Sequence, residues 1–334
     1  MVYYLLRRLV GAVAVLFGVV TGTFVLSHVV PSCPACAVAG LRAGPEQIKA
    51  AAHSLGLDRP VWDQYGTYIS GLAHGDFGIS YASRQPIGPA IAGALPATLE
   101  LVIYSFVLYA LLGVGLGLVW AWRGNRPESW LIRLFSMLGT AMPVFWFAMV
   151  LQLWLASRLG WFPITGRNEI DPPSTITGFH TVDALFTGNL PAFADAAWHL
   201  VLPVTALVMW QFAIAARLTQ KSVLEEMRMP YVRTAIAKGA GTRRVLLGHV
   251  FRNAINPVIT MLGLQFGWLL GGTVLVEVVF SWPGIGNYMY NALQTFDFPA
   301  IMAVTVIITI GFVLVNLVVD LLYPIVDPRI RALA

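Results

Sequence analysis

Six stretches of the chain are each apolar over about 20 residues, the length that an α-helix needs to cross the roughly 30 Å hydrocarbon core of a bilayer. They cover residues 9–30, 97–122, 131–157, 200–217, 258–280 and 300–323. Only 11% of all residues are charged, whereas soluble domains contain about 25%. The sequence therefore predicts an all-α integral membrane protein, with six transmembrane helices in a single domain over residues 1–334.

The distribution of positive charge predicts the orientation, because cytoplasmic loops collect Lys and Arg. With the N-terminus inside, 15 of the 21 Lys and Arg residues fall in cytoplasmic segments. Both termini are then cytoplasmic, and the outer loops cover residues 31–96, 158–199 and 281–299. Arg7 and Arg8 could also precede a cleaved signal peptide, but the apolar run after them is long for one. The same rule explains the net charge of +5, so no nucleic-acid partner is implied.

The chain has two cysteines, Cys33 and Cys36, directly after the first apolar stretch. Two thiols supply only half of the four ligands of a structural zinc site. On the oxidising side of a membrane a local disulfide is favoured, and a pair of free thiols is the alternative. The six histidines are scattered along the chain, so no metal site is predicted.

The first outer loop contains two short helical patterns, over residues 46–55 and 61–72. The second carries aromatic and aliphatic side chains at helical spacing, a composition that suits the headgroup region of a bilayer. We interpret this loop as a cap over the outer mouth, and a merely solvated loop is the alternative. The second long outer loop, residues 158–199, reads as an irregular surface.

Prolines and polar residues interrupt two of the six predicted spans. Pro143 predicts a kink in the third, because proline in mid-helix frees a backbone carbonyl. Pro203 and Gln211 make the fourth the least regular. From polarity and position, the candidates for lining a translocation pathway are Pro143, Gln211, Gln265 and Glu277.

Few ionisable residues fall inside the predicted spans, although such residues mark coupling chemistry in membrane transporters. Glu277 has the greatest depth, whereas Glu100 lies near a helix end, where solvation in the headgroup region would explain it. A proton-driven secondary transporter is therefore poorly supported. Gly263, Gly267 and Gly271 recur every four residues on the fifth span, a spacing that favours close helix packing.

The longest cytoplasmic loop, residues 218–257, is strongly basic, and with Arg217 it contains eight of the 21 Lys and Arg residues. Its centre predicts a short helix that stops at Gly239 and Gly241, followed by a second helix that the Thr242 hydroxyl could cap. The chain contains no phosphate-binding G-x-x-x-x-G-K-[ST] sequence. Energy for any transport must therefore come from a partner, and this loop is the place where a partner could act.

Two segments of that loop resemble the EAA loop of bacterial ABC importer permeases. Residues 231–239 read YVRTAIAKG and residues 249–258 read HVFRNAINPV. They are most similar to the dipeptide, oligopeptide and nickel branch, which typically reads YVRTARAKG and HALRNALIPV. Further matches occur in order along the chain, among them GDFG at 75–78, LPATL at 95–99 and FSWPG at 280–284. The long first outer loop is similar to that of the B-type subunit.

This resemblance implies the type I ABC importer architecture, in the bacterial cytoplasmic membrane, with half of a translocation pathway for di- or oligopeptides. The implied partners are a second homologous permease that completes a heterodimer, two ATP-binding subunits and an extracytoplasmic binding protein. ATP and Mg²⁺ would bind to the ATPase partners, so this chain would hold no cofactor and no catalytic residue.

The resemblance also implies which residues contact the ATPase subunits. They are Arg233, Thr234, Ala235, Ile236, Ala237, Lys238, Gly239, Ala240 and Gly241. The main alternative keeps this mechanism with nickel, haem or another small nutrient as cargo. A stand-alone secondary transporter, or a membrane protein with no pathway, is a more distant alternative.

Overall fold

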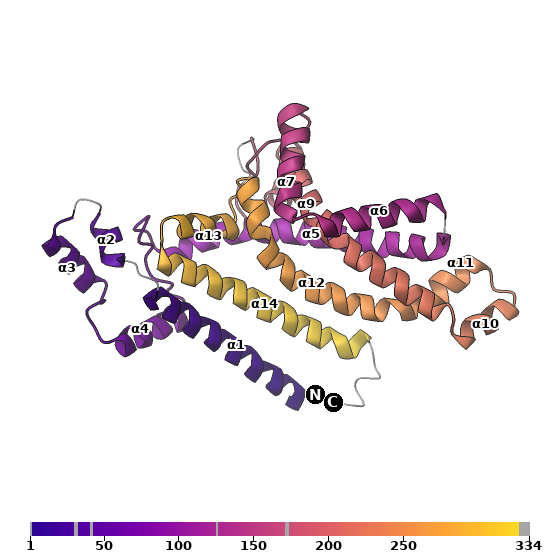
Figure 1. The fold of residues 1–334 in the computed structure, drawn as a ribbon, viewed down its shortest axis with the longest axis horizontal. Coiled ribbons are helices and arrows are strands. Elements are labelled where there is room, and N and C mark those ends of the chain that lie inside the picture. Colours follow the sequence, from indigo (N-terminus) through magenta and orange to yellow (C-terminus); the bar gives the residue numbers. More distant parts are fainter. Residues whose placement is uncertain (1, 30–32, 41–42, 125, 171–173, 327–334) are drawn as a thin grey trace. The chain divides into compact units, whose positions relative to one another are not determined.

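Helices form nearly all of the regular structure in the computed structural model, which describes residues 2–29, 33–40, 43–124, 126–170 and 174–326. Residue 30 of the first predicted span and the C-terminal residues 327–334 lie outside these ranges. The chain forms two compact units (Figure 1): Met1–Thr98 with Pro283–Val313, and Leu99–Trp282 with Leu314–Ala334. Among the described residues, the β-structure consists of one isolated bridge between Ile79 and Pro86. The prediction of an all-helical protein is confirmed.

The first unit contains α1 (Val2–Val29) and the predicted outer cap. The loop predicted to form that cap contains α2 (Pro34–Ala39), α3 (Pro45–Ser54) and α4 (Val61–Ala73), so both predicted short helices are present. The amphipathic α4 packs on α1 through aromatic rings, with Tyr65 and Tyr68 centred 5.0 and 5.8 Å from Phe24. The Tyr65 hydroxyl also lies 2.6 Å from the Thr21 hydroxyl. Part of the apolar face of α4 is therefore covered by α1.

The core of the first unit lies where three segments that are distant in sequence meet. They are the start of α5 (Ile87–Arg123), α13 (Ile285–Gln294) and the start of α14 (Phe298–Val326). Their buried apolar residues are Ile87, Ile91, Ile285, Ala292, Ala300, Ala303 and Val304. The buried Asp297 carboxylate accepts hydrogen bonds from the Ser80 hydroxyl (2.5 Å) and the Tyr81 backbone N–H (3.0 Å). It thereby holds the loop before α5 to the start of α14.

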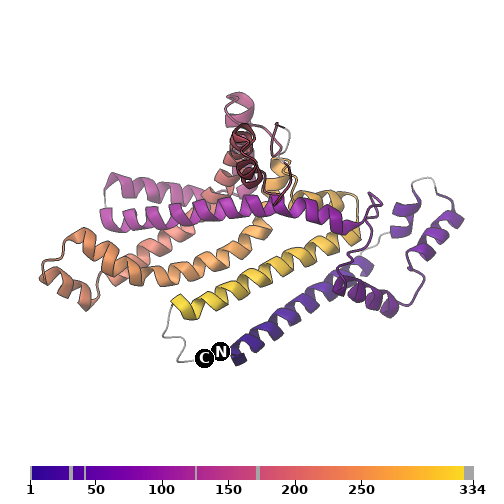
Figure 2. The same ribbon diagram turned by 180° about the vertical axis from the view of Figure 1, so that it is seen from behind.

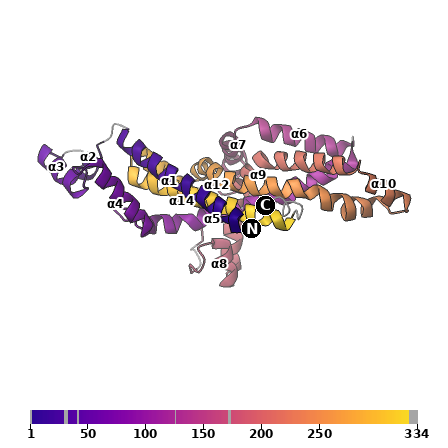
Figure 3. The ribbon, with the colours of Figure 1, turned by 90° about the horizontal axis from the view of Figure 1, so that it is seen from below.

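The second unit is built around α9 (Leu190–Glu226). It packs against α6 (Pro127–Ala141), α7 (Val144–Leu151), α8 (His180–Phe186) and α12 (Phe251–Val279). Figures 1 and 3 show α6 lying alongside the second half of α9. The prediction that Pro203 interrupts this span is wrong, because α9 continues through it without a break.

Glycines bring the helices of the second unit into close contact. A Cβ added at Gly117 of α5 would come within 2.6 Å of the Ala216 carbonyl oxygen of α9. One added at Gly139 of α6 would overlap the Met209 carbonyl, and one at Gly263 of α12 would overlap the Val319 side chain of α14. The predicted close packing therefore holds at Gly263, whereas Gly271 faces open space.

The third predicted span, residues 131–157, is two helices rather than one kinked helix. α6 ends at Ala141 and α7 begins at Val144, and the two are bent by 109° at this break. Proline disfavours the helical conformation of the residue before it, and Met142 is accordingly extended (φ −101°, ψ 134°). Pro143 then serves as the N-cap of α7, which continues into a π-helical stretch, Gln152–Arg158.

Five helical segments of the described chain are long and apolar enough to cross a membrane. They are Leu6–Val29, Ile87–Arg123, Leu190–Glu226, Thr242–Val279 and Phe298–Val319. The bent pair of α6 and α7 raises the number to six if it counts as one span. The predicted number of spans therefore depends on that pair.

Candidate functional site

The basic loop predicted as a docking element forms a short helix, α10 (Pro230–Ala237). Pro230 occupies its first turn, where the missing N–H costs no helical hydrogen bond. At its other end Gly239 has a φ of +81°, a left-handed conformation that glycine adopts without steric cost. The next N–H, of Ala240, then reaches back to the Ala235 carbonyl (3.1 Å). The predicted stop at Gly239 is thus present in the structure.

The second predicted helix of the loop is α11 (Thr242–Arg244), which continues through a π-helical stretch, Val245–Val250, into α12. The expectation that the Thr242 hydroxyl caps it is wrong. Gly241 is the N-cap and makes no side-chain hydrogen bond, and Thr242 is already the first helical residue. Because Gly241 itself has the extended conformation of an N-cap (φ −64°, ψ 148°), the helix begins one residue earlier than expected.

One face of α10 is fixed to the ends of the neighbouring helices. Val232 is buried in an apolar cluster whose other members are Ala121, Val223, Val245, Leu246, Val250 and Ala254. The Tyr231 hydroxyl donates to the Glu226 carboxylate (2.6 Å) and accepts from the Asn253 side-chain amide (3.1 Å). Partial burial, followed by the hydrogen bond to Glu226, raises the pKa of Tyr231 above its usual value. The helix is therefore tied to both α9 and α12.

Most of the remaining surface of α10 is open to solvent. Arg233, Thr234, Ala237 and Lys238 are exposed, and the apolar Ile236 side chain is 59% exposed. Figures 1 and 2 show α10 and α11 at the tip of the second unit, beyond the end of α9 and the start of α12. A protruding surface with small side chains and an exposed Ile fits a protein-docking surface, where apolar groups become desolvated on contact.

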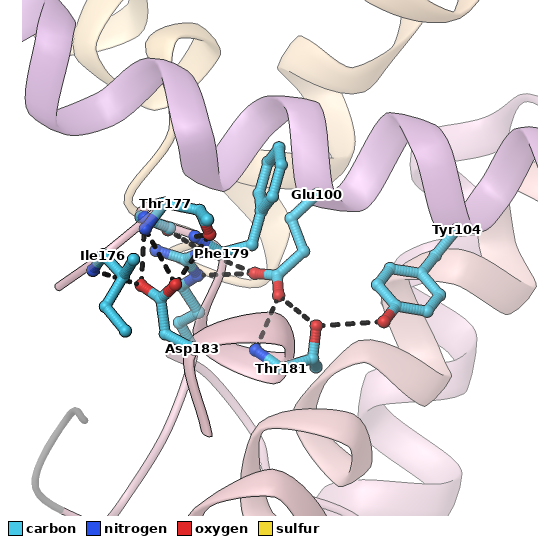
Figure 4. A network of polar contacts seen from close by, with 9 residues as sticks. Glu100, Tyr104, Ile176, Thr177, Phe179, Thr181 and Asp183 are labelled. Atoms are coloured by element: carbon cyan, nitrogen blue, oxygen red, sulfur yellow. Dashed lines mark hydrogen bonds and ion pairs between the residues drawn. The ribbon is translucent and has the colours of Figure 1, made fainter. Parts of the chain in front are cut away.

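A second polar site, which the sequence did not predict, lies where α5 meets α8 and the loop before it (Figure 4). The Glu100 carboxylate, 2% exposed, accepts hydrogen bonds from the Arg167 guanidinium at 2.5 and 2.9 Å. Its other oxygen accepts from the Thr181 N–H (2.9 Å) and hydroxyl (2.6 Å). Glu100 is therefore a buried ion-pair partner, and the interpretation that solvent explains it is wrong.

A neighbouring carboxylate organises the loop before α8. Asp183 accepts hydrogen bonds from the backbone N–H groups of Ile176, Thr177 and Gly178 and from the Thr177 hydroxyl. Burial raises the pKa of the Asp183 carboxyl, but the hydrogen bonds outweigh it, so that the pKa lies below its usual value. The second outer loop is therefore partly a folded structure rather than an irregular surface.

The four predicted pathway residues occupy separate places in the second unit. Pro143 is exposed at the break between α6 and α7, Gln265 of α12 is half-buried, and Gln211 of α9 and Glu277 of α12 are buried. None of them lines the apolar cavity of about 270 Å³ beside the break, which lies between α6, α7 and α9. Residues on its wall include Leu138, Ala206 and Met209. Their role in lining a pathway therefore stays a prediction.

The structure joins Cys33 and Cys36 in a disulfide at the start of α2. Within the described ranges, no group of three or more His, Cys, Asp and Glu side chains is placed to hold a metal ion.

Long apolar helices and a protruding basic loop define this chain as a multi-pass membrane protein with a surface suited to protein docking. Residues 113–332 match the family described as binding-protein-dependent transport system inner membrane component. Residues 1–102 match the N-terminal membrane component of the same transport systems. The chain belongs to this family, and is an ABC importer permease of the bacterial inner membrane.

Curated relatives align over nearly the whole chain. One is the dipeptide transport system permease protein DppB of Alkalihalophilus pseudofirmus, 41% identical over 99% of this chain and 100% of the relative. Another is the probable D,D-dipeptide transport system permease protein DdpB of Escherichia coli, 40% identical over 97% and 96%. The glutathione transport system permease protein GsiC of Escherichia coli is 36% identical over 99% of both.

Family membership determines where the chemistry of transport takes place. Members are the non-catalytic membrane components of importers, and ATP is hydrolysed on separate subunits. The family also implies ATPase and binding-protein partners for this chain.

Proposed function

We propose that this permease forms half of the pathway through which a bacterium imports dipeptides and other short peptides. The similarity of the whole chain to permeases named for dipeptides supports this cargo. Glutathione, named for another relative, is itself a short peptide. Nickel or haem is the competing cargo class.

The cargo can be tested in proteoliposomes that contain the complete importer and its binding protein. We expect ATP-dependent uptake of labelled dipeptides and competition by unlabelled dipeptides, with glutathione as a second competitor. Uptake of nickel or haem that dipeptides do not inhibit would contradict the peptide assignment while leaving the ATP-driven mechanism intact.

The proposed assembly contains a second homologous permease in a heterodimer, two ATP-binding subunits with ATP and Mg²⁺, and an extracytoplasmic binding protein. In this assembly residues 233–241 dock on an ATPase subunit. The exposed Ile236 face of α10 supports that role, because Val232 and Tyr231 connect the same helix to α9 and α12. Closure of the ATPases would then displace both helices together.

The docking role can be tested with substitutions that act on the exposed surface or on the end of α10. Ile236→Asp should weaken co-purification of the ATPase subunits, because it places a charge in the proposed contact. Gly239→Ala should also weaken coupling, since a left-handed conformation costs an L-residue about 1–2 kcal/mol. A matched control is Gly248→Ala, where an added Cβ meets no atom within 4 Å. Normal ATPase binding and uptake in both loop variants would contradict the docking role.

A further inference from the structure

The Gln211 side chain of α9 is buried without hydrogen bonds. It is 1% exposed, and neither its Nε2 nor its Oε1 has a partner among the described residues. Most buried polar side chains have at least one partner, and leaving both a donor and an acceptor unpaired destabilises the arrangement that buries them. The unpaired Gln211 amide therefore destabilises the helix packing that buries it.

Two other polar residues of α9 form hydrogen bonds within the helix. The Thr205 hydroxyl donates to the Val201 carbonyl (2.6 Å), and the Arg217 Nε donates to the Ala213 carbonyl (3.2 Å). The Thr219 hydroxyl, eight residues beyond Gln211, is buried without a partner, as Gln211 is. Two unpaired polar side chains thus lie on the buried surface of one helix.

The Gln211 amide lies beside close contacts that α9 makes with α5 and α12. One turn along the helix, Ala215 would overlap a Cβ placed at Gly113 of α5. The preceding residue, Trp210, lies 3.5 Å from the position of a Cβ at Gly272 of α12. A shift of α9 relative to α5 or α12 would open space for water beside the amide.

We propose that Gln211 biases the permease away from the described arrangement, and that its amide is hydrated in a second arrangement of α5, α9 and α12. The residue acts as a conformational element rather than as a fixed part of the pathway wall. This inference goes beyond the proposed function and does not depend on the cargo. It requires only that the helices of the second unit rearrange during the ATP cycle.

The first test measures the access of water to position 211. The importer with Gln211→Cys, assembled with cysteine-free partners in lipid nanodiscs, is treated with a small methanethiosulfonate with and without a non-hydrolysable ATP analogue. The disulfide between Cys33 and Cys36 leaves no free thiol among the described residues. We expect the labelling rates in the two states to differ by about tenfold or more. Leu224→Cys, an exposed position on α9, should react in both states.

The second test removes the amide. Gln211→Met keeps an unbranched side chain of similar size, and should slow the opening-dependent exchange of α9 backbone amides by about tenfold. It should also raise the midpoint of thermal unfolding. Gln220→Met makes the same change on α9 at a half-buried amide and should alter neither quantity.

Two results would overturn the inference. One is a methanethiosulfonate labelling rate for Gln211→Cys that is the same with and without the ATP analogue. The other is a Gln211→Met protein whose exchange and unfolding midpoint match those of the wild type. If Gln211→Met does not assemble, hydrogen exchange of wild-type α9 decides, because uniform protection around residue 211 in all states excludes a hydrated arrangement. Peptide uptake is measured separately, so its failure would not affect this test.

Discussion

Two buried carboxylates in the second unit, those of Asp183 and Glu100, stabilise its outer loop through direct hydrogen bonds and an ion pair. Asp183 replaces water at three successive backbone N–H groups, and Glu100 neutralises a buried guanidinium. Sequence patterns did not identify Glu100, because its partner Arg167 is 67 residues away and no local spacing relates them. Fully buried Arg and Glu are rare unless they are paired, so only the three-dimensional contact identifies the role.

Asp183 gives a pH prediction for the outer loop. Its folded-state pKa is lowered, so its hydrogen bonds stabilise the loop fully above the unfolded pKa of about 3.9. That stability is lost as the pH falls through the folded value, below the usual carboxyl range. The protection factors of the Ile176–Gly178 amides, which correct for the pH dependence of intrinsic exchange, should therefore be constant at neutral pH and fall only in strong acid. In Asp183→Asn the same amides should exchange faster at neutral pH, and an unchanged rate would contradict the assigned role.

At the scale of helices, glycine spacing predicted close packing but not which glycines provide it. Gly117 of α5 faces the α9 backbone, whereas Gly115, two residues away, meets no atom within 4 Å of an added Cβ. The difference depends on which face of α5 meets α9, and the sequence, with Gly113, Gly115 and Gly117 at every second residue, does not specify that face. Likewise Pro143 predicted a bend, but not that Met142 would leave the helix entirely.

These two glycines form a matched pair for testing the α5–α9 contact. Gly117→Ala should destabilise the purified permease by about 1–3 kcal/mol, because an extra carbon in a packed contact forces the backbones apart. Gly115→Ala should be neutral or stabilising by about 0.5–1 kcal/mol, since alanine favours the helix. Thermal unfolding in detergent would measure both, and equal effects would mean that α5 and α9 pack differently.

The ion pair of Glu100 and Arg167 connects α5 to the outer loop and can be tested by a double-mutant cycle. Glu100→Met leaves the Arg167 guanidinium buried without a counter-charge, which should cost about 3–5 kcal/mol of unfolding free energy. Adding Arg167→Met should recover most of this loss, because two apolar side chains tolerate burial together. The exposed pair of Lys221 and Glu225 serves as a control, where Lys221→Met should change stability by less than about 1 kcal/mol. Additive losses at Glu100 and Arg167 would contradict a direct pairing.

For the whole molecule, apolar length predicted the membrane class and most of the spans, because long helices in lipid satisfy their own backbone hydrogen bonds. The motifs of the loop predicted its short helix and its stop at Gly239. Apolar length could not predict which of these helices are buried by other helices and which are exposed on the surface of the chain. In α9, 72% of the most apolar window is buried, whereas in Leu6–Val29 only 6% is. Both segments qualify as membrane spans by length and composition, which do not show which of them is buried by other helices.

The difference in burial predicts that α1 tolerates larger apolar side chains and that α9 does not. Ala215→Leu in α9 should prevent assembly or lower stability by about 1–3 kcal/mol, because the site is fully buried against α5. Val13→Leu in α1 should have little effect, since Val13 is exposed to the surroundings. Membrane expression and thermal unfolding of both variants would measure this, and a comparable loss at Val13 would indicate that α1 is covered by a partner subunit.

The bond between Cys33 and Cys36 also carries information about biogenesis. Such bonds persist in oxidising compartments and are rare in the reducing cytoplasm. In the predicted orientation the pair lies outside, directly after α1, so we expect it to be oxidised only once this helix has carried the segment across the membrane. The ratio of oxidised to reduced chains in a cell therefore records the fraction of molecules whose first helix has inserted, and it does so independently of the arginine distribution.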